Sequence, residues 1–297
     1  PDGSVSCIIG AMDLPSRTFW RIDIKVPEKG AYFETNSFWY NPSSFNQSYY
    51  AWSNAAVKAG DDLQYIFPGN YHIAHNYSEP LESWPVDSTG RDLSWYKNND
   101  FGGSKSYFTV GEYEEHFGGY WHDDAFGFGH WALYDDMPGH KVWIWALSRE
   151  GMIWEDLLTD ADGQYSEPQA GRFLNQNDHG FFSPCQADKW KELWFPYREI
   201  GPMDEASSIG ALNVNWNGGL EVAFFPITSV DDDIVVLKGE EEILRKHLRL
   251  EPEMVFKHRI QGLEYSSSFQ FPHLCNIKSS IPFIKTDTYR YHKCKNS

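Results

Sequence analysis

The chain has few of the features that mark membrane, disulfide-rich or nucleotide-binding proteins. Only four cysteines occur in 297 residues, and their positions show no metal-ligand spacing or disulfide framework. No apolar run approaches the roughly 18 residues that a membrane-spanning helix needs. Glycine-rich phosphate loops, nucleophile elbows and dinucleotide-binding fingerprints are also missing. The sequence therefore predicts no membrane span, no metal site and no cofactor.

Basic residues are scarce as well. The chain carries 25 Lys and Arg against 42 Asp and Glu, which gives a formal net charge of −17. Such a charge repels nucleic acid and anionic membrane surfaces, so we expect a neutral or cationic partner. The acidic surface could equally serve solubility alone. The compartment stays open, with a periplasmic or secreted location slightly favoured over the cytoplasm, because a signal ahead of Pro1 could have been removed.

Aromatic residues, in contrast, are abundant. The chain has 13 Trp, 17 Tyr and 20 Phe, which together make up 17% of the sequence. A hydrophobic core claims most of them, but the number exceeds what a core usually needs. Apolar ring faces with a polar tip suit sugar rings, which stack on indole while their hydroxyls bond nearby polar groups. Carbohydrate, as an oligosaccharide or a glycoside, is therefore the expected partner.

Short alternating or aromatic runs, separated by turn residues, predict antiparallel strands up to about residue 240. The expected strands cover residues 19–26, 31–41, 130–135, 140–147, 220–227 and 233–239. Residues 239–250 read as a helix with leading acids and following bases, or as a strand-turn-strand, and as solvated in either case. The pattern predicts an all-β sandwich of two large antiparallel sheets with few or no helices. Residues 1–270 would form one domain, and the Lys-rich residues 271–297 an arm or the start of a truncated second domain.

The segment from Gly163 to Pro196 carries the strongest functional signal. Strand alternation places Tyr165, Glu167 and Gln169 on one face of the same strand. Such a face is costly to bury dry, because each polar group would need a partner. It predicts a wet, concave site in which Gln169 holds a sugar hydroxyl. Glu167 would be a general base or nucleophile, with sugar binding and a structural role as alternatives.

Several blocks of the sequence resemble a known family. Ser166-Glu167-Pro168-Gln169, followed by Ser183-Pro184, resembles the strand that carries the general base in aldose epimerases of the galactose mutarotase type. Residues 83–95, 126–147 and 190–196 resemble, over roughly residues 1–270, an uncharacterised family of mutarotase-like domains. The resemblance implies a galactose mutarotase-like β-supersandwich and a sugar-processing neighbourhood, but no settled reaction. Because such domains often precede tetratricopeptide repeats, it also implies a possible repeat region in the parent protein.

The resemblance breaks down at the general acid. Mutarotases carry this acid in an Asn-His-x-Tyr-Phe-Asn motif, and the corresponding stretch here is residues 49–54, with Trp52 near the His position. Trp52 is expected to contact sugar instead. Since epimerisation needs proton transfer at both the ring oxygen and the anomeric hydroxyl, the missing His argues against simple mutarotation.

A replacement acid is expected between residues 111 and 131. His130 is the first choice, and Glu114 and Asp124 are the other catalytic candidates. Further substrate-binding candidates here are His116, Trp121, His122 and Trp131. The glycines at 118, 119, 127 and 129 would let the backbone approach a ligand. The alternative is an exposed acidic loop.

Two further segments could contribute to a sugar site. His72 and His75 could bind sugar, and their spacing would allow a metal pair, although satisfied loop histidines are the simpler interpretation. The block 83–95 offers Trp84, Arg91 and Asp92 as a subsite, or forms a long loop pinned by its tryptophans.

The favoured function is that of a glycoside hydrolase that uses paired carboxylates, Glu167 and a partner from residues 112–135. The alternatives are a non-catalytic carbohydrate-binding module, a sugar epimerase with a rebuilt acid, and a structural platform whose cleft is blocked by the C-terminal arm.

Overall fold

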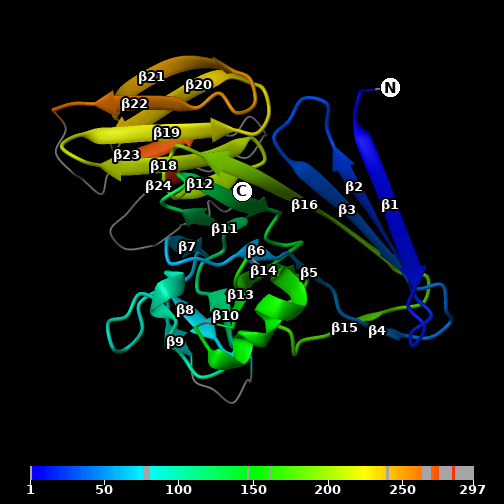
Figure 1. Ribbon diagram of the computed structural model, residues 1–297. Helices are drawn as coiled ribbons and strands as arrows, with labels where there is room; N and C mark the ends of the chain where they lie inside the picture. The colour runs from blue at the N-terminus through cyan, green and yellow to red at the C-terminus, as the bar shows by residue number, and fades with distance from the viewer. Residues whose placement is uncertain are drawn as a thin grey trace.

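The computed structural model describes residues 2–75, 81–145, 147–160, 162–238 and 241–262, and the backbone of 269–273 and 283–284. It consists of antiparallel sheets stacked in layers (Figure 1). Helical structure in the described residues is limited to η1 (Tyr96–Asn98), η2 (Arg149–Gly151) and η3 (Glu155–Thr159), with residues 153–154 helical directly ahead of η3. None of the described helices is long and apolar enough to cross a membrane.

The first sheet has seven strands. Their order is β1 (Val5–Met12), β2 (Phe19–Val26), β3 (Phe33–Tyr40), β16 (Ala187–Arg198), β12 (Phe126–Trp131), β11 (His116–Trp121) and β7 (Leu63–Ile66). Strand β16 is 12 residues long and pairs with β3 along one half and with β12 along the other. Because β16 links the two groups of strands, β1, β2 and β3 extend the sheet to one side of the body (Figure 1).

The second sheet also has seven strands. They are β9 (Glu82–Ser83), β8 (Tyr71–Ile73), β10 (Lys105–Val110), β13 (Gly139–Ile144), β14 (Tyr165–Gly171) and β5 (Trp52–Asn54), with β6 (Val57–Lys58) also paired to β14. A separate two-stranded sheet joins β4 (Gln47–Tyr49) to β15 (Gly180–Phe182). The prediction of an all-β sandwich with two large antiparallel sheets is confirmed.

A smaller C-terminal sandwich follows. One of its sheets contains β17 (Glu205–Ser207), β18 (Gly210–Trp216), β19 (Leu220–Pro226) and β22 (Phe256–Ile260). The other contains β21 (Glu241–Leu250), β20 (Val230–Lys238), β23 (Phe269–His273) and β24 (Phe283–Ile284). The expected arm, 271–297, lies outside the described residues apart from the backbone of parts of β23 and β24. The domain boundary near residue 270 therefore stays a prediction.

The helical interpretation of residues 239–250 is wrong, because residues 241–250 form the strand β21. Pairing with β20 places Arg245 near Asp233, 3.0 Å away, and His247 beside the same carboxylate. Cross-strand pairing thus outweighs the helix-like order of charges, as tertiary context often does. Most side chains of β21 are exposed, which agrees with the expected solvated face.

The described residues form four hydrophobic clusters, and the three largest hold the layers together. Phe117, Tyr107 and Val142 belong to the core between the first and second sheets. Tyr197 and Phe225 belong to the core between the first sheet and the C-terminal sandwich, whose own interior is a third cluster. The first sheet is therefore covered on both faces in its central part.

The glycines of β11 and β12 serve packing rather than ligand approach. Gly127 lies opposite Tyr197 and Gly129 opposite Phe195 in the strand register. A Cβ on either glycine would overlap the aromatic ring of its partner. Glycine is required at these positions because it has no side chain, which leaves room for the aromatic rings, and not because of its conformational freedom.

Candidate functional site

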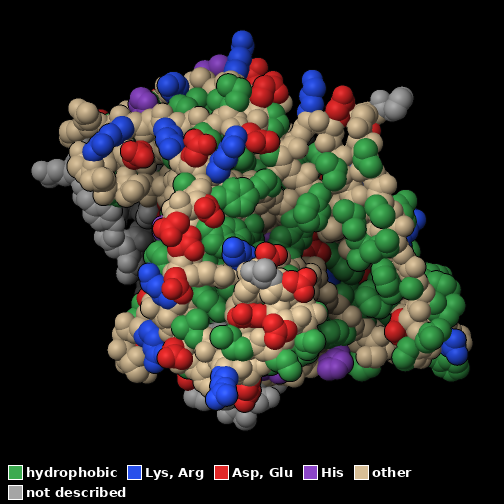
Figure 2. Space-filling view, viewed as in Figure 1, with side chains coloured by type: hydrophobic (Ala, Val, Ile, Leu, Met, Phe, Trp, Pro, Cys, Tyr) green, Lys and Arg blue, Asp and Glu red, His purple; other side chains and the backbone are tan. Residues whose placement is uncertain are grey.

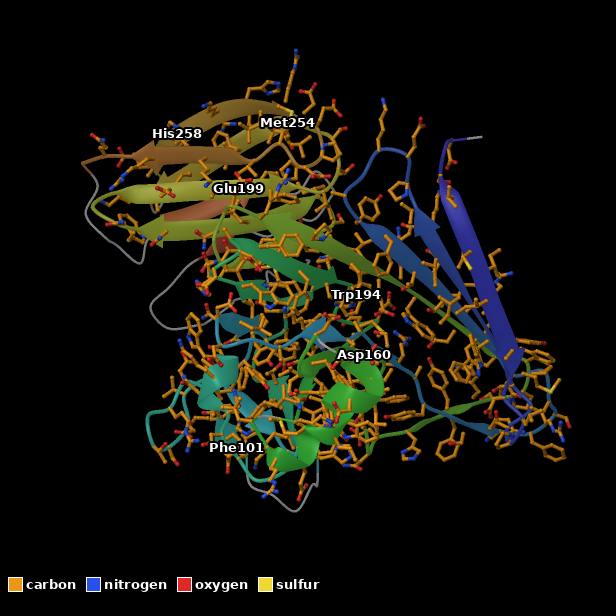
Figure 3. The ribbon with its side chains drawn as sticks, viewed as in Figure 1. Phe101, Asp160, Trp194, Glu199, Met254 and His258 are labelled. Carbon is orange, nitrogen blue, oxygen red and sulfur yellow. The ribbon has the colours of Figure 1, made fainter. Side chains whose placement is uncertain are left out.

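A cleft of about 660 Å³ opens between the two large sheets, where β1, β2 and β3 diverge from the body. Its lining comes from β2, β3 and β16 of the first sheet and from β5, β13 and β14 of the second. Figure 2 shows hydrophobic side chains bordering this side of the molecule, and Figure 3 shows side chains of the two sheets facing each other across the gap. The volume is in the range of small-molecule sites.

Five tryptophans supply much of the cleft wall. They are Trp20, Trp39, Trp52, Trp143 and Trp190. Trp52 lies against the backbone of β14, so close to Gly171 that a Cβ at this position would overlap its indole ring. The cleft therefore offers broad apolar faces beside polar groups, which is the combination that sugar rings require.

The second sheet places four polar side chains in rows across neighbouring strands. Asn54 and Lys141 lie opposite Gln169 on either side of β14, and Trp143 lies opposite Glu167. Residues that are directly paired point to the same face of a sheet. The face of β14 predicted from alternation is thus continued by the paired residues of β5 and β13, and all five residues line the cleft.

Hydrogen bonds fix the carboxylate of Glu167. Its Oε2 accepts from Asn54 Nδ2 at 2.8 Å and from Gln169 Nε2 at 3.0 Å. Gln169 Oε1 in turn accepts from Gln176 Nε2 at 2.9 Å and from Lys141 Nζ at 3.4 Å. Gln169 therefore connects the carboxylate of Glu167 with the ammonium of Lys141, without a direct ion pair between them.

Lys141 is the principal residue that the sequence reasoning missed. It is 3% exposed, and its Nζ donates to Gln176 Oε1 at 2.8 Å and lies 5.1 Å from the ring centroid of Phe108. Burial lowers its pKa to about 8, while the nearby charge of Glu167 acts in the opposite direction. The signal in the sequence was the alternation of residues 140–145, which puts Lys141 on the face of Trp143.

His75 also lines the cleft, as expected for a binding residue. Burial and the charge of Lys141 lower its pKa, so its imidazole is neutral near pH 7. Four of the predicted site residues thus meet in this cleft: Glu167, Gln169, Trp52 and His75. Tyr165 is adjacent, with its ring centroid 6.2 Å from that of Trp143.

His130 lies behind the cleft wall. It is fully buried, and its Nε2 is 3.0 Å from Oε2 of Glu192, which is 2% exposed. The same oxygen accepts from Ser53 Oγ at 2.6 Å, and Oε1 accepts from the indole of Trp190 at 3.1 Å. Through Trp190, which lines the cleft, this buried pair supports the wall without itself reaching the ligand space.

Glu114 and His116 form a separate cluster with Glu205 of β17. Their potential ligand atoms lie within 4.8 Å of one another, and Nδ1 of His116 is 3.8 Å from Oε2 of Glu114. Burial and the charges of Glu112 and Glu115 raise the pKa of Glu114 to about 7. Burial lowers the pKa of His116 to about 4. The cluster has the donor set of a cation site, but none of its members lines the cleft.

The other candidates from residues 111–131 lie at the surface or in packing contacts. Asp124 is exposed in the turn between β11 and β12. His122 stacks on Trp95 with centroids 4.6 Å apart, Trp121 donates to the carbonyl of Lys58, and Trp131 packs against the core of Tyr197. None of these residues lines the cleft, so none of them supplies the predicted replacement acid there.

The 83–95 block behaves as a loop that is fixed by its own contacts. Trp84 is 5% exposed and donates to the carbonyl of Phe67 at 2.8 Å. Arg91 lies near Asp87, and Asp92 accepts from the backbone and hydroxyl of Ser94. His72, another predicted binding residue, is buried against the rings of Trp84 and Tyr107. None of these side chains lines the cleft.

Several solved structures resemble the described fold. A TPR-domain containing protein from Parabacteroides distasonis is 22% identical, with a TM-score of 0.58 over 69% of this chain and 35% of its own. The chain thus spans about a third of that protein. A putative aldose 1-epimerase from Escherichia coli K12 is 4% identical, with a TM-score of 0.48 over 67% of each chain. A galactose mutarotase-like protein from Lactobacillus casei is 11% identical, with a TM-score of 0.46 over 66% of this chain and 71% of its own.

A family model gives the assignment. It matches residues 1–197, which include the first two sheets and every residue that lines the cleft. The similarity to mutarotase-like domains of proteins with tetratricopeptide repeats, predicted from the sequence, is confirmed. The chain belongs to the family described as Domain of unknown function (DUF5107).

Proposed function

We propose that this domain binds a carbohydrate in the tryptophan-lined cleft and that Glu167 acts on the bound sugar as a general base. The observation that carries the proposal is the convergence of five indoles with Glu167, Gln169 and Asn54 in one open cavity. Indoles offer stacking faces, and the amides and carboxylate offer the hydrogen bonds that sugar hydroxyls need. The sugar-related folds among the similar structures agree with this proposal.

Among the described residues that line the cleft, Glu167 is the only carboxylate. A hydrolase with paired carboxylates needs a second one about 5 to 9.5 Å away. The geometry therefore favours an acid–base reaction, such as epimerisation with a rebuilt acid, over paired-carboxylate hydrolysis. The described lining offers Lys141 and His75 as titratable groups that could complete such a reaction.

The test combines a glycan-binding screen with a search for sugar products, using the wild type and Glu167→Gln. We expect turnover by the wild type and a loss of at least about 100-fold in kcat for the variant, because general-base catalysis contributes about 10²- to 10⁴-fold. Binding should persist, since a carboxamide keeps the size of the side chain and one acceptor oxygen.

Glu253→Gln provides the control, because Glu253 forms a surface pair with Arg198 and neither residue lines the cleft. It should leave turnover unchanged. Saturable binding without any product would reduce the proposal to a carbohydrate-binding module. Equal turnover by the wild type and Glu167→Gln would remove the catalytic role of Glu167.

A further inference from the structure

The cleft contains a buried cation that has no carboxylate among the described residues as an ion-pair partner. Lys141 is 97% buried, yet its hydrogen bonds go to the neutral amide oxygens of Gln176 and Gln169. No salt bridge joins it to any residue in the described part of the chain. A buried charge is costly unless it is paired, so an unpaired ammonium in a ligand cavity indicates that the ligand supplies the partner.

A second cation lines the same cleft from the opposite sheet. Arg21 of β2 has its guanidinium 5.7 Å from the ring centroid of Phe38, and it too forms no salt bridge with a described residue. Among the described residues that line the cleft, there are thus two cations, Arg21 and Lys141, and one carboxylate, that of Glu167. This excess is unexpected in a chain with 42 acidic and 25 basic residues.

The carboxylate of Glu167 does not neutralise Lys141 directly. Gln169 lies between them and bonds to both, and Asn54 donates a further hydrogen bond to the same carboxylate oxygen. The ammonium has three N–H donors, of which the described contacts use two. One donor is therefore left for a ligand in the cleft that Glu167 also lines.

We infer that the sugar bound in this cleft carries an anionic group, a carboxylate as in a uronic acid, which pairs with Lys141 on the cleft floor. This inference rests on the proposed sugar-binding function and narrows its substrate class. Charge-assisted hydrogen bonds contribute roughly twice as much as neutral ones. Acidic sugars should therefore be selected over neutral ones despite the negative charge of the whole protein.

The experiment measures equilibrium binding of size-matched oligosaccharides by titration calorimetry. The probes are trigalacturonate, the neutral trisaccharide galactotriose, and a sulfated galactotriose. Wild-type protein should bind trigalacturonate about 10- to 100-fold more tightly than galactotriose, as expected for a hydrogen bond to a charged group. Tighter binding of the sulfated probe than of trigalacturonate would keep an anionic ligand but overturn the assignment of a carboxylate.

Three variants localise the effect. Lys141→Met should abolish the preference for trigalacturonate over galactotriose, and Lys141→Arg should keep most of this preference because the charge remains. Lys97→Met is the matched control, since the Lys97 ammonium also lies over an aromatic ring, 4.8 Å from Trp95, but outside the cleft. Lys97→Met should leave the affinities for all three probes unchanged.

The outcomes separate this inference from the proposed function. Galactotriose binding as tight as that of trigalacturonate would overturn the anionic substrate and leave the sugar-binding cleft intact. A preference that survives in Lys141→Met would also overturn the assignment. No binding of any of the three probes, nor of a broad panel of neutral and acidic glycans, would overturn both proposals together.

Discussion

Glu192→Ala is expected to lower the free energy of unfolding by about 3–5 kcal/mol, the usual cost of removing one partner from a buried ionic or hydrogen-bonded group. The carboxylate is 2% exposed and accepts hydrogen bonds from Ser53 and Trp190, and its Oε2 lies 3.0 Å from Nε2 of His130. Truncation would leave His130 Nε2 and the indole of Trp190 without this acceptor in a closed environment, and the hydroxyl of Ser53 with only the carbonyl of Ala170 at 3.4 Å. Chemical denaturation at pH 7 measures the loss.

Two controls make this prediction specific. Glu34→Ala removes a carboxylate on the neighbouring strand β3, whose partner Lys191 is 54% exposed, and should cost under about 1 kcal/mol. Glu192→Gln keeps an acceptor oxygen and should lose less than Glu192→Ala. If Glu192→Ala were no more damaging than Glu34→Ala, the buried pair would not hold the cleft wall.

Acid is expected to destabilise the domain through two buried imidazoles. Burial lowers the pKa of His116 to about 4 and that of His140 to about 3, from an ordinary value of 6.5. As the pH falls below 6.5, these histidines therefore bind protons in the unfolded chain but not in the folded chain. The free energy of unfolding decreases as the pH is lowered. At pH 4 each histidine should cost about 3 kcal/mol relative to pH 7.

Urea unfolding at pH 7 and at pH 4.5 measures this effect, with His140→Gln as the variant. The variant should show a smaller stability loss between the two pH values than the wild type, by about 2–3 kcal/mol. Subtracting the two proteins removes the contribution of the many carboxylates, which titrate in both. An unchanged pH dependence in His140→Gln would show that its imidazole is protonated in the folded state.

The fold could be predicted from local patterns because its strands carry clear alternation. The strand predicted at residues 19–26 matches β2, and that at 220–227 matches β19 to within one residue. The strand predicted at 130–135 instead ends at Trp131 and begins at Phe126. Its first four residues contain Gly127 and Gly129, which read as breaks in sequence but are required by the aromatic rings of β16.

The site could be predicted only in part, because strand order is not visible in a single sequence. Alternation placed Glu167 and Gln169 on one face, where the structure also has them. The partners that complete the cleft come from β2, β3, β13 and β16, and one of them, Lys141, is a charged residue in a largely apolar strand. Residues 111–131 were predicted to supply the acid because titratable side chains are frequent there. In the structure, β11 and β12 direct these side chains into the core or onto the surface.

The most direct test of the central claim is glycan binding by Trp143→Ala beside Trp95→Ala. Trp143 lies opposite Glu167 and lines the cleft, whereas Trp95 packs with His122 outside it. We expect saturable binding of a sugar by the wild type, at least about tenfold weaker binding by Trp143→Ala, and unchanged binding by Trp95→Ala. Absence of saturable binding by the wild type, or equal affinities of the wild type and Trp143→Ala, would contradict a carbohydrate site in this cleft.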